Sequence, residues 1–135
     1  FIDSAMSPDL VFVYGSLKRG FRNHRLLAAA EFIGVAQTEP RFRLLDLGPH
    51  PAMIEHPAAP LAIAGEVYRI DSATSAALDR LEDEGVEYRR VVVPVTMIEG
   101  PGCDQRVVVR QAWTYLWLRP ADPYALWPDA VWREA

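Results

Sequence analysis

The sequence predicts an α+β fold with a mixed, curled sheet. Segments typical of strands outnumber those typical of helices, and the two kinds do not alternate regularly along the chain. A doubly wound fold would need such alternation, because each parallel crossover carries a helix. Half of the 135 residues are hydrophobic and 24% are charged, a composition that favours one domain around a packed core.

Strands are predicted where apolar and β-branched residues cluster between turn residues. Within them, Gly65 predicts a bulge or a close backbone contact, and Pro94 predicts an edge position or a bulge because proline has no N–H to donate. The predicted strands cover residues 10–14, 32–37, 41–47, 61–70, 87–98 and 106–118.

Two helices are predicted. A short one covers residues 24–30, with Asn23 as its N-cap. The second begins after a cap at Asp71 or Ser72 and ends near Gly85, which suits the C′ position. The proline-rich residues 48–60 are predicted to form a long loop, and residues 99–105 a hairpin loop.

Composition also excludes several functional classes. The net charge of −4 favours no nucleic-acid partner and no anionic membrane surface, and no apolar run approaches the length of a membrane span. With Cys103 alone, no intrachain disulfide can form, which suits a cytoplasmic location. We expect one domain over residues 6–135, with residues 1–5 as an expression remnant before Met6; the oligomeric state stays open.

The stretch LVFVYGSLKRG, residues 10–20, ends an apolar strand on a tyrosine, a glycine and a hydroxyl. One interpretation is an ordinary turn, since Gly15 and Ser16 are common turn residues. The other is that successive backbone N–H groups here face an anionic ligand, which glycine would allow to approach closely. These residues alone do not decide between the two.

Metal and nucleophile chemistry receives little support from the sequence. His24, His50 and His56 match no compact metal motif, and the segment around Ser16 is not a G-x-S-x-G elbow. We therefore expect no metal and no cofactor.

An acidic run, Glu82-Asp83-Glu84, stands at the predicted end of the second helix. Carboxylates are disfavoured there by the helix dipole, so local rules would have placed lysine or arginine instead. Glu82 lies at the border of the apolar face, beside Leu81, whereas Asp83 is expected to point toward solvent. Desolvation and the dipole would both raise the pKa of Glu82 toward the range of an acid–base catalyst. The alternative is a surface carboxylate, paired with Arg80 or Arg89.

Four segments in order resemble the γ-glutamylcyclotransferase-like superfamily, nearest to its γ-glutamylamine cyclotransferase type and small bacterial relatives. They are VFVYGSLKRGFRNHRLL (11–27), AGEVYRID (64–71), LDRLEDEGVEYRR (78–90) and AWTYLWLRP (112–120). The resemblance implies a small mixed β-barrel with flanking short helices. It also implies a cavity for a γ-glutamyl group, and Glu82 as the catalytic glutamate. Substrate-binding residues that it implies are Tyr14, Gly15, Ser16, Leu17, Tyr88 and Tyr115, and the proline-containing segment GPHPAMI (48–54) resembles a cavity-lining element of the family.

The reaction implied by this resemblance needs no cofactor. The α-amine of a γ-glutamyl compound attacks its own γ-carbonyl and gives 5-oxoproline and a free amine, so one carboxylate suffices for the proton transfers. The partner is then a small γ-glutamyl molecule, with γ-glutamylamines, γ-glutamyl-amino acids, glutathione and a biosynthetic intermediate as candidates. A binding or interaction domain that keeps the cavity without the reaction is the alternative function.

Overall fold

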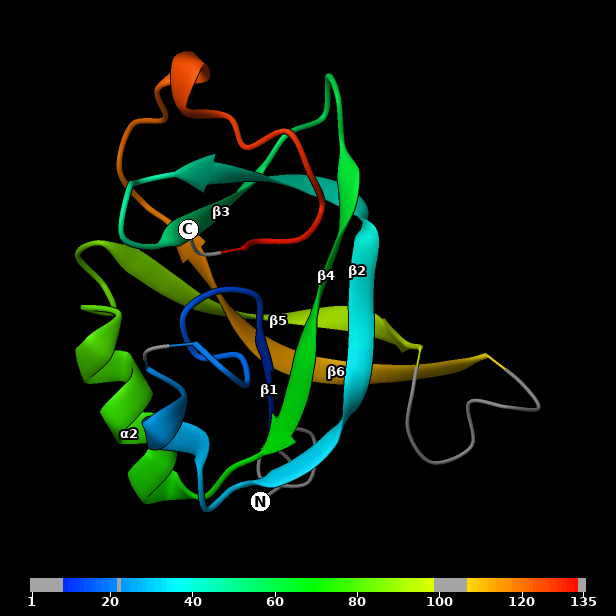
Figure 1. Ribbon diagram of the computed structural model, residues 1–135, viewed down its shortest axis with the longest axis vertical. Helices are drawn as coiled ribbons and strands as arrows, with labels where there is room; N and C mark the ends of the chain where they lie inside the picture. Colours follow the sequence, from blue (N-terminus) through cyan, green and yellow to red (C-terminus); the bar gives the residue numbers. More distant parts are fainter. Residues whose placement is uncertain (1–8, 22, 99–106, 134–135) are drawn as a thin grey trace.

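The computed structural model describes residues 9–21, 23–98 and 107–133. Five strands close a mixed barrel (Figure 1) in the order β1, β4, β2, β5 and β6. Four of the five pairings are antiparallel, and β6 returns to β1 in parallel, at Val11 and Trp113. The predicted α+β class and barrel are confirmed. The barrel strands are β1 (Leu10–Val13), β2 (Glu31–Asp46), β4 (Leu61–Arg69), β5 (Tyr88–Met97) and β6 (Val108–Trp117).

Two predicted strands are in fact one. The segments 32–37 and 41–47 join in the long strand β2, which passes through Pro40 with register shifts against β4 on either side of it. The irregular register accommodates the proline, which would have interrupted a regular ladder. In Figure 1, β2 bends over after this region, and its second half leaves the barrel to pair with β3.

The predicted loop over residues 48–60 is wrong in part, because it contains strand β3 (Pro51–Glu55). Proline begins this strand, a position where its missing N–H is tolerated. β3 pairs antiparallel with the end of β2 and meets β6 at Met53 and Leu116. The hairpin loop predicted for 99–105, including Cys103, lies outside the described residues, as does Met6.

Gly65 and Pro94 occupy positions that fit their predictions. A Cβ on Gly65 would lie 2.4 Å from the carbonyl oxygen of Val13 and 2.7 Å from the Phe12 ring, so the close backbone contact is confirmed. Pro94 pairs with Gln111 of β6, while the β2 register on the other side of β5 spans residues 95–97. Pro94 therefore stands just beyond the part of β5 that has strands on both sides.

The predicted helix over 24–30 is a single 3₁₀ turn, η1 (His24–Leu27), and Asn23 stands at its N-cap position as predicted. The Asn23 side chain makes no capping bond to η1. The second helix, α2 (Ser72–Leu81), is capped by Asp71, whose carboxylate accepts from the N–H of Thr74 at 2.8 Å. α2 lies against η1 on the outside of the barrel (Figure 1).

α2 ends earlier than the sequence predicts. Glu82 is its C-cap, and Asp83, with φ of 51°, takes the left-handed C′ position expected for Gly85. The N–H of Asp83 bonds to the carbonyl of Arg80 and that of Glu84 to the carbonyl of Asp79, which makes a Schellman motif. Aspartate tolerates this conformation better than most residues. The acidic run thus stands at and beyond the helix end rather than in its last turn.

Two buried clusters share the interior. One fills the barrel and includes Phe12 and Trp132, so part of the tryptophan-rich C-terminal segment covers the barrel. The other lies between the barrel and the two helical segments, around Val13, Leu27 and Leu78. Successive β1 residues alternate between the two clusters, as the pleat of a strand requires.

A short 3₁₀ turn, η2 (Pro123–Ala125), follows β6. No helix in the described part of the chain is long and apolar enough to cross a membrane.

Candidate active site

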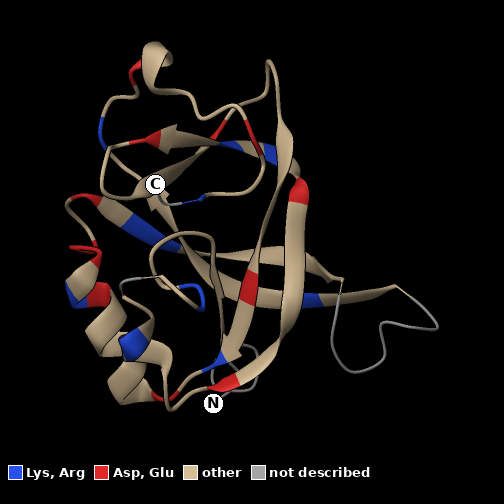
Figure 2. Ribbon diagram, viewed as in Figure 1, with Lys and Arg blue, Asp and Glu red and all other residues tan. Residues whose placement is uncertain are grey.

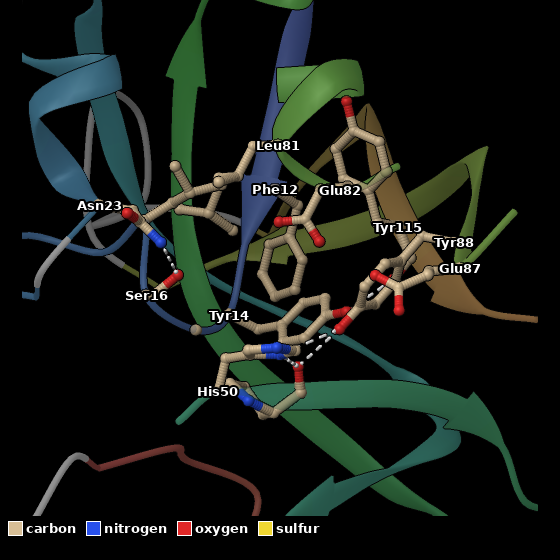
Figure 3. A pocket seen from close by; sticks show the side chains of 14 residues that line it. Phe12, Tyr14, Ser16, Asn23, His50, Leu81, Glu82, Glu87, Tyr88 and Tyr115 are labelled. Atoms are coloured by element: carbon tan, nitrogen blue, oxygen red, sulfur yellow. Dashed lines mark hydrogen bonds between the residues drawn. The ribbon is translucent and has the colours of Figure 1, made fainter. Parts of the chain in front are cut away.

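A cavity of about 170 Å³ opens where β1 ends, at the meeting of the two buried clusters. Engineered cavities of about 150 Å³ admit benzene, so a five-membered ring is of a suitable size. Figure 3 shows side chains from β1, α2, β5 and β6 directed around this space. All seven residues predicted for the site line it. The lining residues are Phe12, Val13, Tyr14, Gly15, Ser16, Leu17, Asn23, His50, Pro51, Leu81, Glu82, Glu87, Tyr88 and Tyr115.

The turn after β1 forms one wall. Lys18 N–H closes it by donating to the Gly15 carbonyl at 3.0 Å, and Arg19 N–H donates to the Glu66 carboxylate at 2.9 Å. By contrast, within the described residues the N–H groups of Ser16 and Leu17 have no protein acceptor. Two backbone donors are therefore available beside the cavity.

Asn23 holds this turn in place. Its side-chain amide donates to the Ser16 hydroxyl at 2.8 Å, and its backbone N–H donates to the Ser16 carbonyl at the same distance. Asn23 is the predicted N-cap residue of η1, but its side chain bonds to Ser16 instead of capping the helix. An asparagine seven residues after a tight turn carries no sequence signal for such a contact.

Gly15 is required by packing rather than by a special backbone angle. A Cβ there would lie 2.7 Å from the side chain of Pro51, the first residue of β3. The two cations that follow, Lys18 and Arg19, contact residues outside the cavity lining. Lys18 Nζ donates to the Trp132 carbonyl at 2.9 Å, and the Arg19 guanidinium lies 4.0 Å from the Phe32 ring centroid.

The three tyrosines predicted for substrate binding have their hydroxyls engaged within the protein. Tyr14 donates to the Tyr115 carbonyl at 2.7 Å, Tyr88 to the Pro51 carbonyl at 3.1 Å, and Tyr115 to Asp79 Oδ1 at 2.6 Å. Burial is the main reason why the pKa of each phenol is raised. These neutral rings form walls of the cavity, and the Tyr115 hydroxyl points away from it toward α2 (Figure 3).

Glu82 is the half-buried member of the acidic run; Asp83 and Glu84 are exposed, as predicted for Asp83. Burial raises the pKa of Glu82 to about 7, and the nearby charge of Glu87 adds to the effect. Within the described residues, the Glu82 carboxylate has no hydrogen-bond or ion-pair partner, so the predicted alternative of pairing with Arg80 or Arg89 is not observed. A carboxylate without a partner in a cavity is suited to exchanging protons with a ligand.

A family model described as gamma-glutamyl cyclotransferase, AIG2-like, matches residues 11–134. The chain belongs to this family. The resemblance noted in the sequence is thereby confirmed, and it covers almost all of the described residues.

Individual relatives agree with this family. The gamma-glutamylcyclotransferase family protein YtfP of Escherichia coli K12 is 33% identical over 92% of this chain and 96% of its own. Human gamma-glutamylaminecyclotransferase is 35% identical over 71% of this chain and 69% of its own. A crystal structure of an AIG2-like protein from Mus musculus superposes with a TM-score of 0.79 at 28% identity, covering 93% of this chain and 88% of that one.

In this γ-glutamyl cyclotransferase family member, two polar cavity residues, Asn23 and Glu87, were not predicted for the site. His50 lies in the segment GPHPAMI, which the family resemblance did place at the cavity. Its Nδ1 lies 3.3 Å from the Tyr88 hydroxyl (Figure 3). Glu87 immediately precedes Tyr88, which the family resemblance did single out, so its position next to a binding residue was the available signal.

The other two histidines lie apart from the cavity lining. His24 Nδ1 is 2.9 Å from the Leu17 carbonyl, and His56 Nδ1 accepts from the N–H of Ala59 at 3.2 Å. In the described ranges, no group of three or more histidine, cysteine, aspartate or glutamate residues is arranged to hold a metal ion. Action without a metal or cofactor stays a prediction.

Proposed function

We propose that this protein is a γ-glutamyl cyclotransferase, which converts a γ-glutamylamine or γ-glutamyl-amino acid to 5-oxoproline and a free amine. The observation that carries the proposal is Glu82, a carboxyl with a pKa near 7 and no protein partner among the described residues, in a cavity large enough for the product ring. Family membership and the names of the relatives support the same reaction. A cytoplasmic location fits this role.

Glu82 would act as general base and then as general acid. Its carboxylate takes one proton from the α-ammonium of the substrate, and the freed amine attacks the γ-carbonyl carbon. The protonated Glu82 then gives its proton to the departing nitrogen as the old C–N bond breaks. The second proton of the ring nitrogen follows to the departing amine, through the regenerated carboxylate. A group whose pKa lies near the working pH serves both directions best.

The turn after β1 would supply the electrostatic part of catalysis. Attack on the γ-carbonyl places negative charge on its oxygen, and backbone N–H groups that are already fixed stabilise such charge without reorganisation. In the described part of the chain, the N–H groups of Ser16 and Leu17 have no protein acceptor and could take this role or bind the α-carboxylate, and the contacts of Asn23 hold the turn. Tyr14, Tyr88 and Tyr115 would enclose the substrate with their rings.

A substrate panel tests the proposal. Purified protein is incubated with γ-glutamyl-ε-lysine, several γ-glutamyl-amino acids and glutathione, each with and without a chelator, and 5-oxoproline is quantified. We expect release from at least one compound, unchanged by the chelator. Binding of these compounds without any 5-oxoproline would favour a non-catalytic binding domain, and activity lost with the chelator would point to a metal.

A further inference from the structure

The end of α2 is joined to the barrel by a polar network that centres on Asp79. Tyr115 of β6 donates its hydroxyl to Asp79 Oδ1 at 2.6 Å, and Arg90 of β5 places a guanidinium nitrogen 3.4 Å from Asp79 Oδ2. Arg90 also donates to the Ser75 hydroxyl at 2.6 Å and covers the Trp113 ring at 4.4 Å. Figure 2 shows the acidic end of α2 beside the basic start of β5.

Asp79 stands one helical turn before Glu82, and its main chain also takes part in ending the helix. Its carbonyl accepts the N–H of Glu84 at 3.0 Å in the Schellman motif that has Glu82 as its C-cap. The side chain and backbone of Asp79 therefore fix the same helix end from two directions. Side chains three apart on a helix lie on neighbouring positions, so a shift at Asp79 carries Glu82 with it.

Glu82 depends on this support because its own carboxylate has no protein partner among the described residues. Its distance from a ligand in the cavity is set by where the helix end lies. The other anchor of this turn is Leu78, which is fully buried. Leu78 fixes how deep the helix packs, whereas Asp79 fixes the helix end against β5 and β6.

We propose that Asp79 is the positioning residue for Glu82. It would hold the general base at the reaction distance through its bonds to Tyr115 and Arg90; this inference rests on the proposed cyclotransferase activity. Tyr115 then has two roles, as its ring lines the cavity and its hydroxyl anchors the helix. Positioning of a reacting group is demanding, since a misplacement of about 1 Å can cost on the order of 10²-fold in rate.

The test compares Asp79→Ala, Asp79→Asn and Tyr115→Phe, with Ser75→Ala as a matched control. Ser75→Ala removes another bond between α2 and Arg90, but two turns away from Glu82. We expect Asp79→Ala to lower kcat about 10- to 100-fold with little change in KM. Asp79→Asn keeps an acceptor for Tyr115 and should restore part of the rate, while Ser75→Ala should stay near wild type.

A double-mutant cycle and a titration complete the test. If the Tyr115–Asp79 bond is what matters, the pair Asp79→Ala and Tyr115→Phe costs less than the product of the two single effects. Carboxyl NMR of Glu82 should show its pKa in Asp79→Ala moving from near 7 toward the ordinary range, a readout that needs no turnover. Equal kcat or an unmoved Glu82 titration in a folded Asp79→Ala would overturn the proposal. Absence of 5-oxoproline release by wild type would contradict the cyclotransferase proposal instead.

Discussion

At Glu82, burial at the helix end, beside the cavity, raises the pKa of a carboxyl group. The residue follows the last turn of α2 and lines a cavity together with the rings of Phe12, Tyr14, Tyr88 and Tyr115, so its charged form loses solvation. The sequence pointed to Glu82 because acidic residues at a helix C-terminus are disfavoured by the helix dipole and so break a local rule. Glu87 could not be predicted from the local sequence, since it breaks no local rule and reaches the cavity only through tertiary packing, whereas the segment with His50 was indicated by the family resemblance alone.

Replacing Glu82 should stabilise the protein in a pH-dependent way. With a folded pKa of about 7 against an ordinary 4.5, the folded state binds more protons than the unfolded state between these values. Stability is therefore lost as pH rises through this range, by at most about 3 kcal/mol. Glu82→Gln escapes that loss, so its advantage over wild type should be near zero at pH 4 and largest at pH 8.

Urea unfolding of both proteins at pH 4 and pH 8 measures this difference. The comparison at pH 4 serves as the internal control, because both side chains are then neutral. The same free-energy difference at both pH values would show that Glu82 titrates in its ordinary range.

Among the elements, those with a clear period and clear caps were predictable, and those that depend on proline or on tertiary pairing were not. α2 was expected from its spacing of apolar residues and from a cap at Asp71 or Ser72, of which the structure has Asp71. β3 was missed because the prolines of residues 48–60 suggested a loop, although Pro51 only begins the strand. β2 was divided in two at Pro40, because only its partner β4 shows that an irregular register lets the strand continue.

The end of α2 offers a test at this scale. In the described part of the chain, Asp83 is the one non-glycine residue with a positive φ. This conformation favours glycine and strongly disfavours β-branched residues. Asp83→Gly should keep or raise stability, by up to about 1 kcal/mol, whereas Asp83→Val should lower it by about 1–2 kcal/mol. Thermal unfolding of the two variants beside wild type measures the effect. Equal melting temperatures for all three would contradict the Schellman geometry.

For the whole molecule, closure of the barrel brings together residues that lie far apart in the sequence. The parallel contact of β1 with β6 sets the turn after β1 beside Tyr115, a hundred residues later, and the end of α2 adds Leu81 and Glu82 to the cavity lining. Composition and periodicity predicted only a curled mixed sheet. The barrel and the grouping of the seven site residues came from the family resemblance, because strand order is set by long-range pairing that no local pattern encodes.

The central claim, that Glu82 performs the proton transfers, is tested most directly by the turnover of Glu82→Gln on a confirmed substrate. Glutamine has nearly the same size and keeps the fold, but it cannot accept the ammonium proton. Asp83→Asn and Glu84→Gln make the same charge change next to it; asparagine tolerates the left-handed C′ position, and glutamine keeps an acceptor for the Arg90 N–H. The account predicts that Glu82→Gln binds substrate but loses about 10²- to 10⁴-fold in kcat, while both controls retain most activity. Wild-type turnover by a folded Glu82→Gln would contradict it.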